Sequence, residues 1–352
     1  MLSSHSNLRI AFKLAISWRF FDVYSFGQGI HLEFYFFMGT QPITISIISV
    51  SMNRSKNLIK SVESVSKCSN HLEHVVVDWS SDVPLNTKDF PDDSRIRLYR
   101  VEGEVHWSLS KAYNFGISQC RGQVILKLDA DHIIDPRFFE CNEVSFRSFL
   151  ANDFSINGAL KKSVTGIFLV PKTKFDQVGG FNEYLQGWGY DDLDLFARLR
   201  GVCDQRPLNI EHIDNIEHGD NERVKNSAVE YNLKKAIDIK RITNLRNKWI
   251  SEKVVWNRYT GRCEYSRDGG AWFRCNDVVV PEYLRGSLDK ATEQIELQVK
   301  LKTDFSGISK TEFDIVERSC KRPIGYALIF GWFRFSFYFT KMLLKVFRYF
   351  DR

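Results

Sequence analysis

Two groups of closely spaced aspartates are the residues in this chain whose types and spacing could do chemistry. The first, Asp129 and Asp131, follows the aliphatic run Val124–Leu128, which has the pattern of a buried strand. Alternate side chains of an extended chain share a face, so both carboxylates can point at one object. Because no Lys or Arg lies between them, a divalent cation is the simplest way to relieve their repulsion. The pair predicts a metal site at the end of a strand, with a solvated strand-to-loop corner as the alternative.

The second group is Asp191, Asp192 and Asp194, which follow the segment Gly187-Trp188-Gly189-Tyr190. Acidic residues in the first turn of a helix complement its dipole, and this explains one or two of the three aspartates. It does not explain the glycines on both sides of Trp188. We therefore treat the segment and its aspartates as a second candidate site.

Composition limits the classes of protein that the chain could represent. Its 352 residues suffice for one large domain with an appendage, or for two domains. An apolar content of 43% excludes overall disorder, and a net charge of +6, much of it near the C-terminus, is no nucleic-acid signature. The seven cysteines form no CxxC motif, which argues against a zinc ribbon or disulfide scaffold and favours a reducing compartment. We find no signal-peptide pattern and no apolar run long enough to cross a bilayer.

The elements that must position these residues alternate between strands and helices. This pattern predicts βαβ units and a largely parallel sheet, in which ligands bind at the carboxyl ends of the strands. Asp78 and the Asp129/Asp131 pair both fall at such ends. Strands are expected at 43–50, 74–78, 96–101, 124–128 and 166–170, and helices at 109–119, 172–178 and 191–200.

In this order the segments resemble a nucleotide-sugar-dependent glycosyltransferase of the GT-A fold. The first half is similar to family 2, in Ser46–Arg54, Val75–Asp78 and Leu128–Asp131. The second half is similar to the family 7-like group of galactosyltransferases and chondroitin polymerases, and the matching segments are Trp107–Asn114, Gly166–Val170, Gly179–Glu183 and Gly187–Asp194. The resemblance implies a GT-A, Rossmann-like α/β fold with a mixed, largely parallel sheet flanked by helices.

The resemblance also implies a metal site for Mn²⁺ or Mg²⁺. Asp131 would be a ligand, and Asp129 would contact the metal or the ribose of the donor. His218 stands where related enzymes place an imidazole ligand, with His212 as its competitor and an ordinary surface histidine as the alternative. Mixed oxygen and imidazole ligation favours Mn²⁺ over Mg²⁺.

The resemblance assigns the remaining site residues to the donor and the acceptor. Asp192 would be the general base, with Asp191 hydrogen-bonding the acceptor. Trp188 would offer a flat face to a sugar ring, and Gly187 and Gly189 would let the backbone come close to it. The donor is expected to be a UDP-sugar, bound by Asp78, Trp79, Lys111, Asn114 and Asp129.

Two departures from the family patterns concern the donor. Trp79 stands where family 2 members commonly have a second Asp, and we expect its ring to stack on the base. Leu109 stands where the 7-like group has Arg.

The expected domains are an aromatic-rich extension at 1–40, a GT-A catalytic domain at 41–250, a small accessory cap at 251–322 and an amphipathic helix at 323–352. In that helix Arg334, Lys341, Lys345, Arg348 and Arg352 follow one helical line opposite an aromatic and aliphatic surface. This pattern is typical of a helix in a membrane interface, although a helix docked on the core with outward lysines would share it.

The sequence thus predicts an inverting, metal-dependent hexosyltransferase that acts on a saccharide or glycolipid-linked acceptor at the cytoplasmic membrane face, as in polysaccharide biosynthesis. A catalytically inactive nucleotide-sugar or saccharide-binding module is the alternative. A nucleotidyltransferase is less compatible, because that class prefers a glycine-rich phosphate loop and Ser51–Ser55 contains no glycine. We expect no nucleic-acid partner.

Overall fold

The computed structural model describes residues 42–152, 164, 166–216 and 236–304. The chain divides into two compact units, Met1–Pro42 and Ile43–Arg352, and the following concerns the second. Its helices are α1 (Ser55–Ser66), α2 (Leu109–Ser118), α3 (Phe138–Cys141), α5 (Lys172–Gln177), α6 (Asp191–Leu199), α8 (Ala236–Lys253), α9 (Glu282–Asp304) and the 3₁₀ helix η1 (Thr87–Asp89). Its strands are β1 (Ile45–Ser51), β2 (Glu73–Trp79), β3 (Ile96–Glu102), β4 (Val124–Lys127), β5 (His132–Ile134), β6 (Ser148–Ala151), β7 (Phe168–Pro171), β8 (Asp204–Pro207), β9 (Ile213–Asn215), β10 (Tyr265–Asp268) and β11 (Ala271–Arg274).

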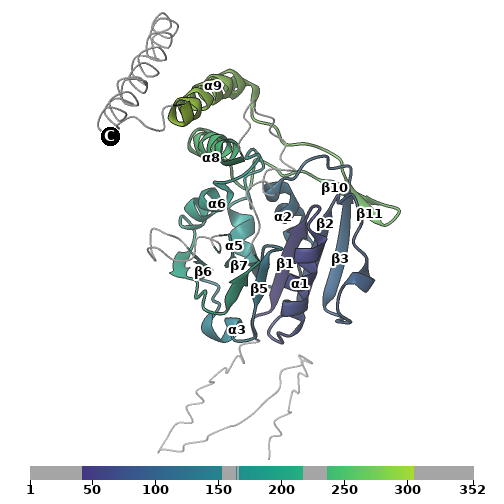
Figure 1. Ribbon diagram of the computed structural model, residues 1–352. Helices are drawn as coiled ribbons and strands as arrows, with labels where there is room; N and C mark the ends of the chain where they lie inside the picture. The colour runs from purple at the N-terminus through teal and green to yellow at the C-terminus, as the bar shows by residue number, and fades with distance from the viewer. Residues whose placement is uncertain (1–41, 153–163, 165, 217–235, 305–352) are drawn as a thin grey trace, which may run out of the picture. The chain divides into compact units, whose positions relative to one another are not determined.

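A nine-stranded sheet forms the centre of the described residues (Figure 1). Its order is β10-β11-β3-β2-β1-β4-β7-β6-β8, and β3, β2, β1 and β4 run parallel to one another. Strand β7 is antiparallel to β4 and β6, whereas β6 and β8 are parallel. The predicted α/β fold with a mixed, largely parallel sheet is confirmed.

Alternation along the strands explains why helices cover both faces of this sheet. Val77 of β2 lies in the core cluster that includes Phe115 of α2, whereas its neighbour Val76 packs with Leu58 of α1. Side chains of successive strand residues point to opposite faces, so α1 and α2 lie on opposite sides of the sheet. The fully buried pattern of β1 and β2 is the pattern of a parallel sheet with two covered faces.

Residues after α8 extend the same sheet. The hairpin of β10 and β11 turns at Gly269-Gly270, and β11 pairs with β3 (Figure 1). Helices α8 and α9 pack side by side beyond α6. The predicted boundary at residue 250 falls within α8, and the domain division stays a prediction.

Two predicted segments, the extension at 1–40 and the helix at 323–352, lie outside the described residues. Within the described residues, no helix is both long and apolar enough to span a membrane.

Candidate active site

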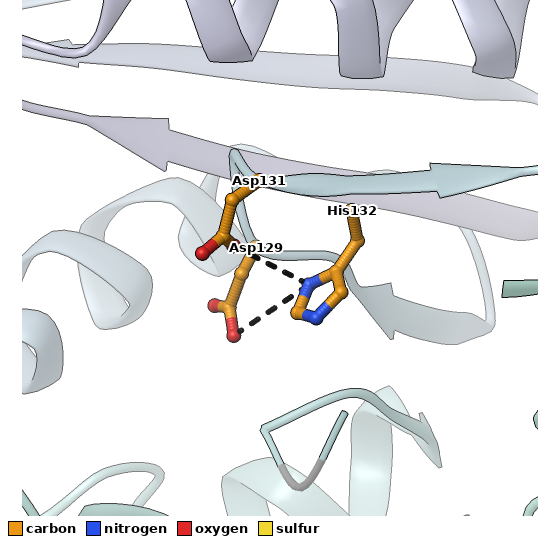
Figure 2. A group of neighbouring side chains, drawn as sticks. All are labelled: Asp129, Asp131 and His132. Atoms are coloured by element: carbon orange, nitrogen blue, oxygen red, sulfur yellow. Dashed lines mark ion pairs between the residues drawn. The ribbon is translucent and has the colours of Figure 1, made fainter. Parts of the chain in front are cut away.

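The end of β4 places Asp129, Asp131 and His132 in one cluster (Figure 2). One ligand atom from each residue lies within 4.8 Å of the other two. The His132 Nδ1 atom is 3.5 Å from Asp131 Oδ1 and 4.0 Å from Asp129 Oδ2. Two carboxylates and an imidazole are a donor set that suits Mn²⁺. His132 directly follows the aspartate pair but was not among the ligands predicted from the sequence.

Asp129 is held by contacts from two other elements. Tyr113 of α2 donates a hydrogen bond of 2.8 Å to Asp129 Oδ1, and the Lys127 ammonium lies 2.9 Å from the same oxygen. Burial alone would raise the pKa of Asp129, but Lys127, His132 and these hydrogen bonds outweigh it and lower the pKa below its usual value. The carboxylate is therefore ionised and oriented at neutral pH.

Lys127 also belongs to the site, although it was not predicted from the sequence. Its side chain is fully buried, and its ammonium donates to the Gly166 carbonyl at 2.7 Å. The ammonium also lies 3.5 Å from Asp192 Oδ1. Burial alone would lower the pKa of Lys127, but Asp129 and Asp192 outweigh it and raise the pKa above its ordinary value. The Lys127 ammonium thus forms ion pairs with one aspartate from each of the two groups.

Gly166 marks the point at which those two groups meet. A Cβ atom added to this residue would lie 2.7 Å from Asp129 Oδ2 and 3.2 Å from Asp192 Oδ2. Both distances are shorter than ordinary van der Waals contact. The Asp129 carboxylate after β4 and the Asp192 carboxylate in the first turn of α6 therefore face the same small volume.

Asp191 and Asp192 begin α6 but have different surroundings. The Asp191 side chain is almost fully buried, and its Oδ1 accepts a hydrogen bond of 3.4 Å from the Ser110 hydroxyl. Burial, with Asp192 next to it, raises the pKa of Asp191 to about 8. Burial also raises the pKa of Asp192, although the charge of Lys127 opposes this rise. The Asp192 side chain is 24% exposed. Asp192 is thus the more exposed carboxylate of the two.

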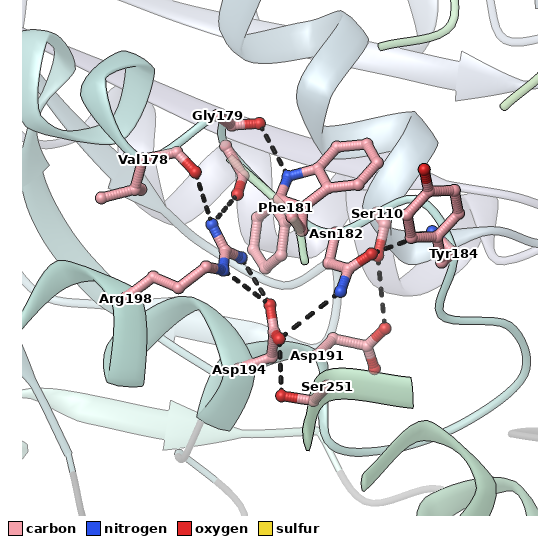
Figure 3. A network of polar contacts seen from close by, with 12 residues as sticks. Ser110, Val178, Gly179, Phe181, Asn182, Tyr184, Asp191, Asp194, Arg198 and Ser251 are labelled. Carbon is pink, nitrogen blue, oxygen red and sulfur yellow. Dashed lines mark hydrogen bonds and ion pairs between the residues drawn. The ribbon is translucent and has the colours of Figure 1, made fainter. Parts of the chain in front are cut away.

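Asp194, the third aspartate of the group, belongs to a structural network (Figure 3). It accepts hydrogen bonds from Arg198 Nε at 3.0 Å and from the Ser251 hydroxyl at 2.7 Å. Arg198 also donates to the carbonyl oxygens of Val178 and Gly180. This network joins α6, the loop before it and α8, so it fixes the position of Asp191 and Asp192.

The loop that carries Trp188 has a strained backbone supported by α8. Gly187, Gly189 and Tyr190 have φ values of 77°, 97° and 71°, a region that favours glycine. Asn247 donates to the Gly189 carbonyl at 2.7 Å. Trp188 is 37% exposed, and the ammonium of Lys240, on α8 like Asn247, lies 4.1 Å from the centroid of its ring. The loop therefore presents a partly open aromatic face at a fixed position.

Three residues predicted to bind the donor have side chains that instead contact other parts of the protein. The Trp79 side chain is fully buried against Phe115 and Tyr265, so the expected stacking on a nucleotide base is wrong. Asn114 donates to Glu183 and exchanges two hydrogen bonds with the Phe181 backbone, and Lys111 is buried and pairs with Asp277. Packing of α2 against the neighbouring segments leaves the polar groups of these two side chains in structural contacts.

The Asp78 carboxylate also makes its contacts within the protein. It accepts hydrogen bonds from the backbone N–H groups of Ser81 and Leu85 and from Arg100, and its side chain is fully buried. Asp78 therefore shapes the loop after β2, and direct contact of its carboxylate with a ligand would require that these bonds open.

Of the two histidines considered as metal ligands, the structure describes only His212. His212 lies with its Nδ1 3.3 Å from Asp135 Oδ2, and Asp135 is not part of the metal cluster. His218 lies outside the described residues. Ile216 donates its backbone N–H to the Asp131 carbonyl oxygen at 2.7 Å, so the described chain passes the metal cluster two residues before His218.

Two protein-family models match consecutive parts of the chain. Residues 46–140 match the model of glycosyl transferase family 2, and residues 147–219 match the model described as the N-terminal domain of galactosyltransferase. Both resemblances stated from the sequence are thereby confirmed, and the enzyme class is that of a glycosyltransferase. Comparison with curated proteins returns no match.

The chain is also similar to several solved structures. The catalytic domain of Drosophila beta1,4galactosyltransferase 7, in complex with xylobiose, is 12% identical, with 71% of this chain and 98% of that chain covered and a TM-score of 0.44. A mutant of that enzyme holds manganese, UDP-Gal and xylobiose, at 11% identity, 71% and 99% coverage and a TM-score of 0.43. Glucosyl-3-phosphoglycerate synthase from Mycobacterium tuberculosis, with Mn²⁺, UDP and phosphoglyceric acid, is 14% identical, with 68% and 88% covered and a TM-score of 0.43.

Proposed function

We propose that this glycosyltransferase transfers a hexose from a UDP-sugar to a saccharide or glycolipid-linked acceptor, with inversion at the anomeric carbon and with a bound divalent cation. The observation that carries the proposal is the meeting of Asp129 and Asp192 at Lys127. This arrangement places the metal-binding cluster beside a carboxylate that begins a helix. A transferase that activates a hydroxyl next to a diphosphate leaving group requires both groups in one volume.

Asp129, Asp131 and His132 offer the protein ligands for the cation, and we propose His218 as a further one. The donor set of carboxylates and imidazole fits Mn²⁺ better than Mg²⁺. When bound, the cation would act as a Lewis acid that neutralises charge on the departing nucleoside diphosphate. The match to family 2 over residues 46–140 supports a nucleotide-sugar donor.

Asp192 is the proposed general base. Its carboxylate accepts the proton of the acceptor hydroxyl while the acceptor oxygen bonds to the anomeric carbon and the bond from that carbon to the diphosphate oxygen breaks. Because Asp191 has its pKa raised to about 8, it is protonated at neutral pH and can donate a hydrogen bond to the acceptor. Direct displacement of this kind inverts the anomeric centre and needs no enzyme nucleophile.

The face of Trp188 is the proposed platform for the acceptor sugar. Its ring is partly exposed, whereas its backbone carbonyl is held by the Thr243 hydroxyl at 2.8 Å. A fixed aromatic face stabilises a sugar ring by stacking and by removal of apolar surface from water. The match to the galactosyltransferase model includes this loop and supports an acceptor role for it.

The test is transfer from a panel of UDP-sugars by the purified full chain, with and without Mn²⁺. A thermal-shift panel of nucleotide sugars first identifies the donor, because a ligand that binds the native state raises Tm. We expect one UDP-sugar to raise Tm only when Mn²⁺ is present, and to be consumed in the presence of acceptor. Binding without consumption would favour the inactive binding module, and no binding would reject both.

The location at the cytoplasmic face of a membrane is a separate proposal. It depends on the basic and aromatic pattern of residues 323–352, which lie outside the described residues. Co-sedimentation with vesicles that contain anionic lipid tests it. We expect the full chain to bind and a variant with Lys341, Lys345 and Arg348 changed to Glu to lose binding, whereas equal binding of both would contradict the proposal.

A further inference from the structure

The surroundings of Lys127 are unusual for a lysine in a central strand. Its side chain has no exposed surface. Lysine is almost never fully buried unless a charged partner compensates the ammonium, so the groups around it matter. Groups from each element packed around the ammonium face it: Asp129 at 2.9 Å, Asp192 at 3.5 Å, the Gly166 carbonyl at 2.7 Å, and the rings of Tyr113 and Phe168 with centroids at 4.8 and 6.0 Å. Only the two carboxylates among these groups carry a negative charge.

The two carboxylates have different proposed tasks. Asp129 belongs to the metal-binding cluster, whereas Asp192 is the proposed base. Their oxygens approach one small volume, since a single added Cβ at Gly166 would contact both. Carboxylate oxygens are good ligands for divalent cations. Without a competing positive charge, a cation held by Asp129 and Asp131 would also attract Asp192 and leave the acceptor hydroxyl without a base.

We propose that Lys127 is a positioning residue that divides the carboxylates of this site, so that Asp129 and Asp131 are available to the metal and Asp192 is kept for the acceptor. Its ammonium is a fixed cation that Asp192 contacts in place of the metal ion. The part of this inference that concerns Asp192 as a base rests on the proposed function. The part that concerns metal binding does not.

The inference predicts that loss of Lys127 changes metal binding and transfer in opposite directions. In Lys127→Met the freed Asp192 joins the metal ligands and the repulsion from the ammonium is removed, so Mn²⁺ binds at least tenfold more tightly. Transfer at saturating Mn²⁺ and donor falls at least a hundredfold, because the base is drawn to the metal. A merely structural role would weaken both.

The measurement is a titration of the full chain with Mn²⁺ alone, in which free Mn²⁺ is followed by electron paramagnetic resonance, together with kcat for transfer. Lys248→Met is the matched control, because it removes one positive charge from the exposed surface of α8. We expect it to leave both quantities unchanged. Melting curves establish that each variant is folded, and Lys127→Gln, which keeps a donor for the Gly166 carbonyl, replaces Lys127→Met if that variant does not fold.

A double-mutant cycle distinguishes two effects of Lys127. The first is the proposed one, in which Lys127 keeps Asp192 away from the metal ion, and the second is repulsion of the metal ion by the ammonium alone. If Lys127 only repels the metal ion, its replacement tightens Mn²⁺ binding equally in the wild-type and Asp192→Asn backgrounds. Division predicts a clearly smaller gain in the Asp192→Asn background, where no carboxylate is released. Equal gains, or no gain in the wild-type background, would overturn the inference. Absence of transfer by the wild-type enzyme would instead reject the proposed function and leave the comparison of Mn²⁺ affinities to decide the metal-binding part.

Discussion

The Tyr113 hydroxyl donates a hydrogen bond of 2.8 Å to Asp129 Oδ1, and this contact ties helix α2 to a carboxylate of the metal cluster. The tyrosine is buried, and burial together with the charge of Asp129 raises its pKa well above the ordinary value. Tyr113 therefore stays protonated and remains a donor at neutral pH. Asp129 is thus oriented by the protein before a cation or a substrate binds.

Asp131→Asn is expected to weaken Mn²⁺ binding at least tenfold and to abolish detectable transfer. The amide removes one negative charge from a cluster in which the ligand atoms lie within 4.8 Å of one another. The Mn²⁺ titration and the transfer assay measure the two effects. Asp135→Asn is the control, because this carboxylate lies four residues away and pairs with Arg137. Unchanged Mn²⁺ affinity in Asp131→Asn would contradict the metal assignment.

Asp192→Asn is expected to reduce kcat by at least two orders of magnitude and to leave the thermal shift caused by UDP intact. The amide keeps the shape of the side chain but cannot accept a proton from the acceptor hydroxyl. Rates with donor and acceptor, and melting curves with UDP and Mn²⁺, measure the two effects. A variant that turns over at the wild-type rate would show that another group is the base.

Gly166→Ala is expected to impair the site more than the fold. Its Cβ would lie 2.7 Å from Asp129 Oδ2 and 2.9 Å from the Lys127 ammonium, so these groups must move apart. We expect a loss of at least tenfold in kcat/KM with a small change in Tm. Gly286→Ala is the matched control: its Cβ would contact nothing within 4 Å, and Ala within a helix is favoured over Gly by about 0.5–1 kcal/mol. Full activity of Gly166→Ala would show that the site tolerates displacement.

Trp188→Ala is expected to raise the KM for the acceptor at least tenfold, with binding of UDP and Mn²⁺ unchanged. The substitution removes the exposed ring, while the loop stays held by contacts of α8 with its backbone. Initial rates at varied acceptor concentration measure the effect. Tyr259→Ala, which removes a more exposed aromatic ring elsewhere, should leave the KM unchanged. An equal effect of the two substitutions would argue against a stacking platform at Trp188.

The burial of Asp191 predicts how stability depends on pH. Its pKa of about 8 in the native state lies above its ordinary value of 3.8, so the native state binds this proton more tightly than the unfolded state. The contribution of Asp191 to the free energy of unfolding therefore falls as pH rises from about 4 to about 8. Asp191→Asn removes this dependence, so its Tm should rise relative to wild type as pH increases through that range.

Melting curves of wild type and Asp191→Asn at several pH values measure this difference. Asp92→Asn is the control for loss of one acidic charge, because Asp92 is exposed. A difference in Tm between wild type and Asp191→Asn that does not change with pH would contradict the assignment of the raised pKa to Asp191.

Local patterns in the sequence located most of the strands and helices around the site. The run expected as a strand at 124–128 forms β4 (Val124–Lys127), and the helix expected at 191–200 forms α6 (Asp191–Leu199). Aliphatic runs and helix-start signals depend on residues close in sequence, so they can be recognised without the fold. The short strands β5, β6, β8 and β9 have no such pattern and were not predicted.

The contacts of the residues predicted to bind the donor have a different physical origin. Trp79 and Asn114 have the chemistry of ligand-binding residues, but packing directs Trp79 into the core and Asn114 toward Phe181 and Glu183. Residue type does not reveal whether a polar or aromatic group faces a ligand or another part of the chain. That choice is made by contacts between segments distant in sequence.

By itself the sequence determined the enzyme class, the α/β sheet and the positions of Asp129, Asp131, Asp191 and Asp192, because each depends on short-range order along the chain. Only the tertiary structure decided that Asp129 and Asp192 share the ammonium of Lys127 and that His132 joins the metal cluster. The antiparallel pairing of β4 with β7 and the packing of α6 bring these groups together. Spacing along a chain does not encode such distances, since they result from the packing of the whole core.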